Sequence, residues 1–280
     1  MKIAVHTLVK NEERFVWYSV MSVIEHVDKI YLWDTGSTDN TFAVLQEIAE
    51  KYPQKVNLRR VGSITPDEFP RVRQEMLDAT TEDWFLMVDG DEIWWNDSIK
   101  KVVKVIKDSK DGKLESIVVP VINLVGDMYH FQESMAGNYQ LVGKKGHYAL
   151  RAIKRSIPGL TSLNPHGTWG WVDKDGKMIQ DRNAKKIKFV DAPYLHATHL
   201  QRAGGVSKEK DVPKRKQKLK KEIGKMFPFD FYYPEAFFYQ KPKIVPDIWK
   251  PMSTSFKIIA YLQTPLRKIK RRLTRPRVGY

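Results

Sequence analysis

The chain has 280 residues, of which 42% are hydrophobic, so it is long enough to bury a large core. It contains no cysteine, which excludes disulfides, thiolate metal sites and a cysteine nucleophile and fits a reducing compartment. Residues 201–280 hold 21 Lys and Arg against 6 Asp and Glu, so the whole formal net charge of +15 lies in this segment.

Two patterns indicate a globular protein without a membrane-spanning segment. Lys2 is followed at once by a strand-like run with His6 and Lys10, which is not the pattern of a secretory signal peptide. The longest weakly polar run, residues 117–126, is too short to span a bilayer. We expect a neutral body, residues 1–205, and a basic, mainly helical extension, residues 206–280.

Strand-like and helix-like segments alternate through the first hundred residues. Short apolar runs are separated by stretches with apolar residues at helical spacing, as in Val16, Val20, Val23 and Val27. This alternation predicts an α/β fold with a mostly parallel sheet flanked by helices. The predicted strands are 3–9, 30–34, 56–61 and 84–88, and the predicted helices are 12–27, 41–49 and 67–79.

The pattern changes after residue 92. A helix is expected from Asn96, and residues 126–146 are polar and Gly-rich, which suits a loop over a site. Residues 174–177 are typical of a hairpin turn. In the extension, 207–225 predicts a largely helical stretch, and 253–273 predicts two short amphipathic helices, the second starting at Pro265. Further strands are expected at 116–124, 148–153, 186–190 and 194–199.

Two carboxylates follow the apolar run 84–88, in the order Asp89-Gly90-Asp91. A strand buried on both faces meets ligands only at its ends, so both side chains are expected in the crevice at the carboxyl edge of the sheet. Their spacing suits two oxygen ligands of one divalent cation, and Gly90 allows close approach of the backbone to a ligand. An Asp-x-Asp pair alone is more typical of a polar turn before a helix, and it is the surrounding chain that favours a ligand site.

Four segments in this order resemble family 2 glycosyltransferases of the GT-A fold. They are residues 5–13, the turn Asp34-Thr35-Gly36-Ser37, residues 70–73, and residues 88–92 with the Asp-x-Asp. Arg73 precedes Asp89 by 16 residues, as in the family pattern. Thr35 and Gln74 depart from the usual Asp and Asn.

The resemblance implies transfer of a sugar from a nucleotide-sugar donor to an acceptor hydroxyl, with inversion at the anomeric carbon. Asp34 would accept a hydrogen bond from the base, typically uracil, which implies a UDP-sugar. Asp91 would bind Mn²⁺ or Mg²⁺, with Asp89 on the metal or the ribose. Arg73 would support the phosphates. The polar residues at the end of the first strand are also suited to the nucleotide: Thr7, Asn11 and Glu12.

Members of this fold often add a late histidine to the metal, and His196 and His166 are the candidates. Residues three apart on a regular strand face opposite sides, so we expect only one of His196 and His199 to enter the site. An inverting displacement also needs a carboxylate base, for which Glu133 and Asp173 are candidates. Trp169 and Trp171 suit either sugar stacking or the core.

Other classes fit less well. The basic segment suits nucleic-acid binding, but no recognised module accompanies it and we expect no nucleic-acid partner. A nucleotidyltransferase of related fold would have a Gly-rich loop with a lysine after the first strand. A haloacid-dehalogenase-type phosphatase would carry its Asp-x-Asp near the N-terminus.

The amphipathic, cationic tail 253–280 suits an anionic membrane surface. We therefore expect a cytoplasmic enzyme, peripheral on the inner face of the membrane, that acts on a glycan or lipid-linked acceptor. The sequence assigns neither the donor sugar nor the oligomeric state.

Overall fold

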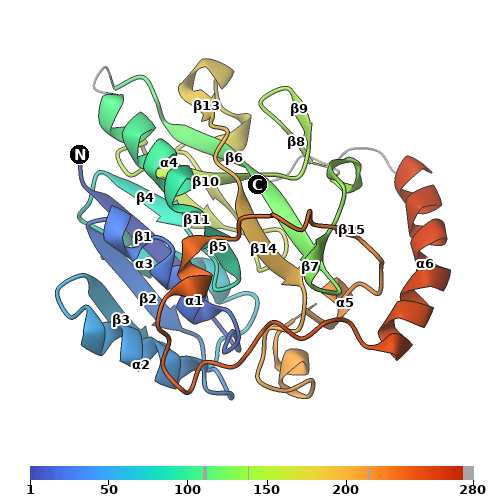
Figure 1. Ribbon diagram of the computed structural model, residues 1–280. Helices are drawn as coiled ribbons and strands as arrows, with labels where there is room; N and C mark the ends of the chain where they lie inside the picture. Colours follow the sequence, from blue (N-terminus) through green and yellow to red (C-terminus); the bar gives the residue numbers. More distant parts are fainter. Residues whose placement is uncertain (110–111, 138, 214, 274–280) are drawn as a thin grey trace.

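The structure, a computed structural model, describes residues 1–109, 112–137, 139–213 and 215–273. A mixed sheet crosses the body with the strand order β15-β7-β6-β10-β4-β1-β2-β3 (Figure 1). Its strands are β1 (Ile3–Val9), β2 (Lys29–Asp34), β3 (Val56–Arg60), β4 (Trp84–Met87), β5 (Glu92–Trp94), β6 (Ser116–Val125), β7 (Asp127–Phe131), β10 (Tyr148–Lys154), β13 (Ile187–Phe189), β14 (Tyr194–His199) and β15 (Lys225–Met226). Two small hairpins pair β8 (Tyr139–Leu141) with β9 (Lys144–Gly146) and β11 (Thr161–Leu163) with β12 (Gly170–Val172).

The helices are α1 (Val16–Met21), α2 (Thr41–Lys51), α3 (Phe69–Asp78), α4 (Asn96–Asp108), α5 (Arg215–Lys218) and α6 (Thr254–Leu273). Strands β1 to β4 are mutually parallel, and β10 runs antiparallel between β4 and β6. Strands β13 and β14 are parallel to β6. The predicted α/β class with a mostly parallel sheet is confirmed.

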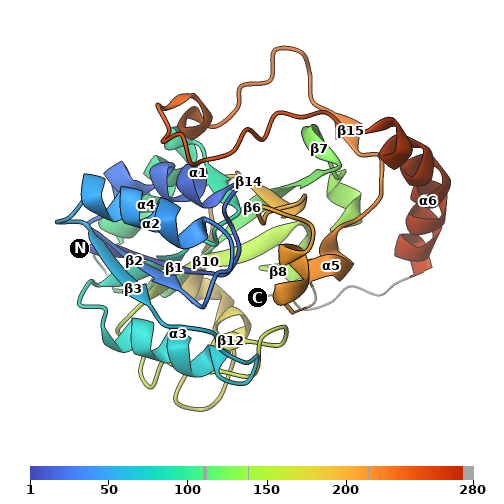
Figure 2. The same ribbon diagram turned by 90° about the horizontal axis from the view of Figure 1, so that it is seen from below.

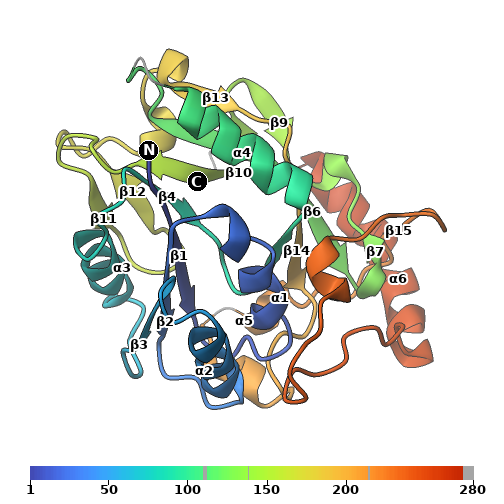
Figure 3. The ribbon, with the colours of Figure 1, turned by 60° about the vertical axis from the view of Figure 1, so that its left-hand side comes forward.

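Alternate side chains of the central strands build two separate cores. Val5 and Leu86 join the core that α1, α2 and α4 cover, and Phe85 joins the core beneath α3 (Figure 3). A fully buried side chain of this size contributes about 1.5–3 kcal/mol to stability. Apart from the buried His6 and Thr7 within β1, the side chains of β1 and β4 are apolar on both faces, and carboxylates follow only beyond the strand ends.

Three local predictions were wrong. Residues 126–146 contain β7, which pairs with β6, and the β8–β9 hairpin rather than only a loop. Within the described part of 207–225, helix is confined to α5 and a short 3-10 turn and the rest is mainly irregular, because Pro213 interrupts the run and the segment bonds to the body. The predicted helix 12–27 is a helix over Val16–Met21 followed by a 3-10 turn.

The C-terminal segment forms one helix, α6, with Pro265 inside it, rather than the two predicted helices. The Thr264 hydroxyl donates to the Ala260 carbonyl at 2.6 Å and accepts from the Ile223 backbone N–H at 2.9 Å, so it does not cap a second helix. Helix α6 stands at the side of the body beside β7 and β15 (Figure 2). No helix in the described part of the chain is long and apolar enough to cross a membrane. The boundary at residue 205 stays a prediction.

Candidate active site

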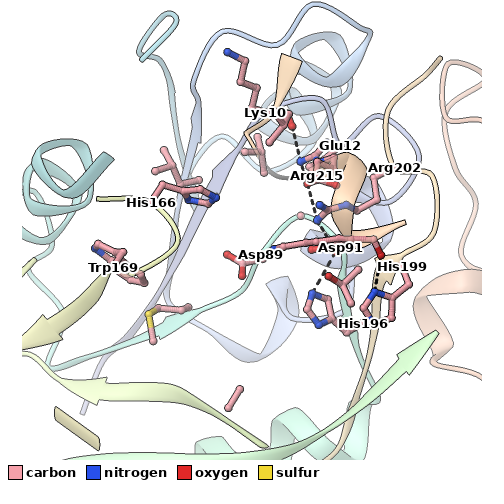
Figure 4. Close-up of a pocket in the computed structure, with 18 of the residues that line it drawn as sticks. Lys10, Glu12, Asp89, Asp91, His166, Trp169, His196, His199, Arg202 and Arg215 are labelled. Atoms are coloured by element: carbon pink, nitrogen blue, oxygen red, sulfur yellow. Dashed lines mark hydrogen bonds and ion pairs between the residues drawn. The ribbon is translucent and has the colours of Figure 1, made fainter. Parts of the chain in front are cut away.

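A pocket of about 710 Å³ lies at the carboxyl ends of β1 and β4. Its walls come from distant parts of the chain, including the turn after β1, the end of β4, β14 and the segment that follows it (Figure 4). Six predicted site residues line it together: Glu12, Arg73, Asp89, Asp91, His166 and His196. The described lining also contains seven Lys or Arg side chains against three carboxylates, which favours an anionic ligand.

Asp91 is the buried carboxylate of the pair, with a side chain only 1% exposed. Its Oδ2 atom lies 2.7 Å from Nη1 of Arg202 and 3.3 Å from Nε2 of His196. Burial opposes ionisation, but Arg202 and then His196 hold the pKa of Asp91 well below its ordinary value. Asp91 is therefore an anion in the resting site.

Asp89 is the accessible carboxylate, with a side chain 37% exposed. Its oxygens lie 3.3 Å from Nη2 of Arg73 and 3.7 Å from Nη2 of Arg151. Burial raises the pKa of Asp89, but Arg151 and then Arg73 lower it by more, so the net result is a pKa below the ordinary value. Arg151 also pairs with Glu92 and donates to the Tyr194 hydroxyl at 2.9 Å, which fixes the guanidinium beneath Asp89.

Gly90 has a packing role that the sequence did not indicate. A β carbon there would lie 2.8 Å from Cγ1 of Val9 and 2.9 Å from Cγ of Glu12. The missing side chain thus lets the end of β4 pack against the turn after β1.

Glu12 connects two arginines from the C-terminal part of the chain. It pairs with Arg215, and Nη1 of Arg202 lies 3.2 Å from its Oε1 atom. Arg215 also donates to the backbone carbonyls of Lys10 and Asn11. The segment after β14 is thereby held across the pocket by buried charge pairs.

The donor set fits one divalent cation when a ligand completes it. Asp91 would supply a carboxylate and His196 an imidazole, and their Oδ2 and Nε2 atoms lie 3.3 Å apart, close enough to reach one ion. Within the described residues, no group of three or more His, Cys, Asp or Glu is arranged around one metal position. The remaining ligands would come from the phosphates of the substrate and water.

Both histidines of β14 line the pocket, so the expectation that only one would enter was wrong. The pairing of β14 with β6 is irregular between His196 and His199, which breaks the alternation of a regular strand. His166 lies farther away in the pocket, where its ring centroid is 4.8 Å from that of Phe69 (Figure 4). His196, not His166, therefore shares the immediate surroundings of Asp91.

Trp169 and Trp171 both belong to the core beneath α3, and Trp169 also reaches the pocket. Trp169 lines the pocket, and its ring lies under the guanidinium of Arg73 at 5.1 Å. Trp171 is 2% exposed, donates to Sδ of Met87, and belongs to the core beneath α3.

Three predicted nucleotide ligands do not reach the pocket surface among its described residues: Thr7, Asn11 and Asp34. Asp34 is fully buried and accepts hydrogen bonds from the backbone N–H groups of Gly36 and Ser37. The Asn11 side chain bonds to Thr38 and to the Lys208 carbonyl. Asp34 and Asn11 therefore shape the turns beside the pocket, whereas Thr7 is buried within β1.

Neither predicted base lies in the pocket as the structure describes it. Glu133 lies 3.6 Å from Lys268 of α6. Asp173 pairs with Arg182 and accepts hydrogen bonds from the backbone N–H groups of Asp175 and Lys177 in its hairpin. Charge pairing and turn formation account for both side chains.

Sequence reasoning missed several cationic residues of the site. Arg151 left one signal, because it is the one charge inside an apolar strand-like run. A basic stretch of the sequence contains or adjoins three further cations, whose sequence context indicates solvent-exposed charges: Arg202, Arg215 and Lys218. Their burial or placement depends on contacts with Glu12 and Asp91, which are about two hundred and about one hundred residues away.

The family model described as glycosyl transferase family 2 matches residues 4–155, more than half of the chain. The chain belongs to this family. The match contains β1 to β4 and both carboxylates of the Asp-x-Asp, and together with the observed sheet it confirms the predicted GT-A fold. The domain is thus a glycosyltransferase domain.

Two curated relatives match shorter segments. A TPR repeat-containing protein of Synechococcus elongatus is 29% identical over 91 residues, 32% of this chain and 21% of that protein. The dTDP-rhamnosyl transferase RfbG of Shigella flexneri is 27% identical over 100 residues, 33% of this chain and 34% of that protein. The matched segments therefore span about a third of these relatives or less.

Solved structures with a similar arrangement include TarS of S. aureus, residues 1–349. It is 16% identical with a TM-score of 0.43, and the match covers 71% of this chain and 61% of that one. Glucosyl-3-phosphoglycerate synthase of Mycobacterium tuberculosis is 17% identical with a TM-score of 0.45, and the match covers 70% of each chain.

Proposed function

We propose that this domain is a metal-dependent, inverting glycosyltransferase that moves a sugar from a nucleotide-sugar, first of all a UDP-sugar, to an acceptor hydroxyl. One observation carries the proposal. Asp89 and Asp91 share a pocket with His196 and with an excess of cationic side chains. A nucleoside diphosphate needs this combination, because its charge must be neutralised both when it binds and when it leaves.

In this proposal Asp91 and His196 hold Mn²⁺ or Mg²⁺. The bound ion would neutralise charge on the leaving diphosphate. Arg202 pairs with Asp91 and Lys218 adds positive charge that also lowers the pKa of Asp91, so both would supply fixed positive charge to the phosphates. Asp89, held by Arg73 and Arg151, is the carboxylate accessible to the ribose or the donor sugar.

We further propose that α6 lies on an anionic membrane at the inner face and brings the pocket to a glycan or lipid-linked acceptor. One face of the helix exposes five apolar or aromatic side chains to between 56% and 71%: Ile258, Tyr261, Leu262, Leu266 and Ile269. Lys257, Lys268 and Lys270 are exposed beside them. A cationic helix with an apolar face fits the interface of an anionic bilayer, where each Lys or Arg contributes about 1 kcal/mol.

A thermal-shift panel tests the donor. UDP-, GDP- and dTDP-sugars are compared with Mn²⁺ and with EDTA; dTDP-rhamnose is included because the Shigella relative is named for it. We expect a UDP-sugar to raise the melting temperature in Mn²⁺ and to lose most of this effect in EDTA. No shift with any nucleotide-sugar would overturn the donor proposal, and equal shifts in EDTA would overturn the metal.

A further inference from the structure

Beside the donor half of the pocket lies a second group of basic side chains, which the transfer chemistry does not use. Lys220, His199 and His147 line the same pocket, on the side that faces α6. The Lys220 ammonium lies 3.1 Å from Nε2 of His199. Nδ1 of His199 lies 2.8 Å from the Lys218 carbonyl and donates to it, and Nε2 faces both the Lys220 ammonium and, at 3.2 Å, Oε1 of Gln132.

The ammonium of Lys220 is not neutralised by a carboxylate. Within the described residues no Asp or Glu lies within salt-bridge distance of it, and His199 is its one hydrogen-bond partner. The nearby Glu222 is taken up by a two-oxygen pairing with Arg271 of α6 and by Gln132. In contrast, Arg73, Arg151, Arg202 and Arg215 each pair with at least one carboxylate.

His147 adds an unused donor or acceptor to this group. Its Nδ1 atom is 2.9 Å from the Asn123 amide, and its Nε2 atom is buried without a hydrogen-bond partner among the described residues. Burial and then Lys220 lower the pKa of His147 to about 4. Asn123 stands opposite His196 in the pairing of β6 with β14, so the group borders the proposed metal position.

We propose that Lys220, His199 and His147 form a phosphate subsite for the acceptor, separate from the site of the donor diphosphate. The acceptor would then be a phosphate-bearing molecule, either soluble or attached to a lipid. This inference rests on the proposed glycosyltransferase function. The link from Glu222 to Arg271, and the bond from Ile223 to Thr264, place the subsite next to α6, on the membrane side of the pocket.

The experiment uses the full chain saturated with UDP and Mn²⁺, so that the donor site is filled. Calorimetry then compares glycerol 3-phosphate with glycerol. We expect glycerol 3-phosphate alone to bind, Lys220→Gln to weaken it about tenfold or more, and Lys220→Arg to retain it. Lys221→Gln, which changes an exposed neighbour outside the pocket lining, is the matched control and should bind like wild type.

Two results would overturn the subsite: glycerol 3-phosphate fails to bind the UDP-loaded protein, or it binds Lys220→Gln as it binds wild type. A parallel tenfold loss of UDP affinity in Lys220→Gln would overturn it too, by assigning Lys220 to the donor. Failure of UDP to bind, with Lys220-dependent binding of glycerol 3-phosphate retained, would instead overturn the nucleotide-sugar proposal and leave the anion subsite.

Vesicles distinguish the two sources of the phosphate. Phosphatidylcholine vesicles carrying phosphatidic acid are compared with vesicles carrying phosphatidylglycerol at the same charge. A Lys220-dependent preference for phosphatidic acid supports the subsite with a lipid-linked acceptor. Lys220-dependent binding of glycerol 3-phosphate without this preference supports it with a soluble acceptor.

Discussion

The Oδ2 atom of Asp91 lies 2.7 Å from Nη1 of Arg202. The carboxylate proposed to hold the metal is therefore already paired with a guanidinium in the resting site. Because Arg202 also lies 3.2 Å from Glu12, it keeps an acidic partner when Asp91 turns toward a cation. This arrangement holds a buried anion in place before the substrate arrives.

We predict that Asp91→Asn abolishes sugar transfer and removes the gain in donor affinity that Mn²⁺ provides. An amide is a weaker metal ligand than a carboxylate and does not neutralise the ion. Since Asp91 is buried and paired, the change also destabilises the fold, by about 1–3 kcal/mol for the lost charge-assisted bond. Calorimetry with and without Mn²⁺ and urea denaturation measure the two effects.

Asp175→Asn, in an exposed turn outside the pocket, is the control for loss of one negative charge. This control should leave both the Mn²⁺-dependent gain in donor affinity and the free energy of unfolding unchanged. Wild-type activity that is undiminished in EDTA would contradict the metal role of Asp91.

For Asp34→Asn we predict a weaker affinity for UDP, with metal or without it. Asp34 organises the turn at the end of β2 by accepting from the Gly36 and Ser37 N–H groups. The amide replaces one acceptor oxygen, which should cost about 1–2 kcal/mol of stability as well. UDP titrations in Mn²⁺ and in EDTA measure the affinity, and Asp67→Asn, at an exposed position, is the control. If Asp34→Asn lowers the stability but leaves the UDP affinity unchanged, Asp34 has only a structural role.

We predict that substitutions of Trp169 and Trp171 have different effects on KM. Trp169→Phe shortens the pocket wall, so we expect KM for the donor or the acceptor to rise about two- to tenfold, in line with an aromatic contact of about 0.5–1.5 kcal/mol. Trp171→Phe, in the core behind it, should lower stability without a change in KM. Because both residues belong to this core, steady-state kinetics are measured at matched folded fractions. A KM in Trp169→Phe equal to that of wild type would contradict a contact between Trp169 and the substrate.

His147 gives a pH dependence of known sign. Its pKa is about 4 in the folded chain against an ordinary value of 6.5, so the unfolded chain takes up the proton first as the pH falls. The stability that its neutral form contributes is therefore complete above pH 6.5 and is lost toward pH 4, by about 3 kcal/mol at most. In His147→Gln this part of the loss should disappear. Urea denaturation between pH 7.5 and 4 measures the free energy of unfolding of wild type and of His147→Gln. If the two free energies fall in parallel with decreasing pH, His147 does not cause the loss.

The face of α6 should decide membrane binding. We predict that Leu262→Glu with Leu266→Glu abolishes binding to anionic vesicles, because two exposed apolar side chains become charged. Leu163→Glu, at a half-exposed position of β11, is the matched control and should bind like wild type. Deletion of 253–280 should have the same effect as the double variant, while transfer to a soluble acceptor analogue survives. Vesicle flotation at low and high salt measures the binding; a double variant that floats like wild type would exclude α6 as the anchor.

Local pattern alone determined much of this protein. The apolar run of β4 and the spacing of α3 and α4 reproduce the observed elements closely, because hydrophobic periodicity reflects which face of an element is buried. The parallel order of the first strands placed Asp89 and Asp91 at the carboxyl edge of the sheet, and the pocket lies there. The resemblance to the family rested on these same residues.

Only the tertiary structure decided which charges line the pocket and which are paired. Three cations belong to a basic stretch whose residues look alike in sequence: Arg202, Arg215 and Lys220. In the described part of the chain, Arg202 and Arg215 are buried against acidic groups, whereas Lys220 has no acidic partner within salt-bridge distance. Glu133 and Asp173 were attractive bases on the chain but pair with cations outside the pocket. A charge is neutralised or left available by whatever lies within a few ångströms, and these neighbours come from parts of the chain that local pattern does not connect.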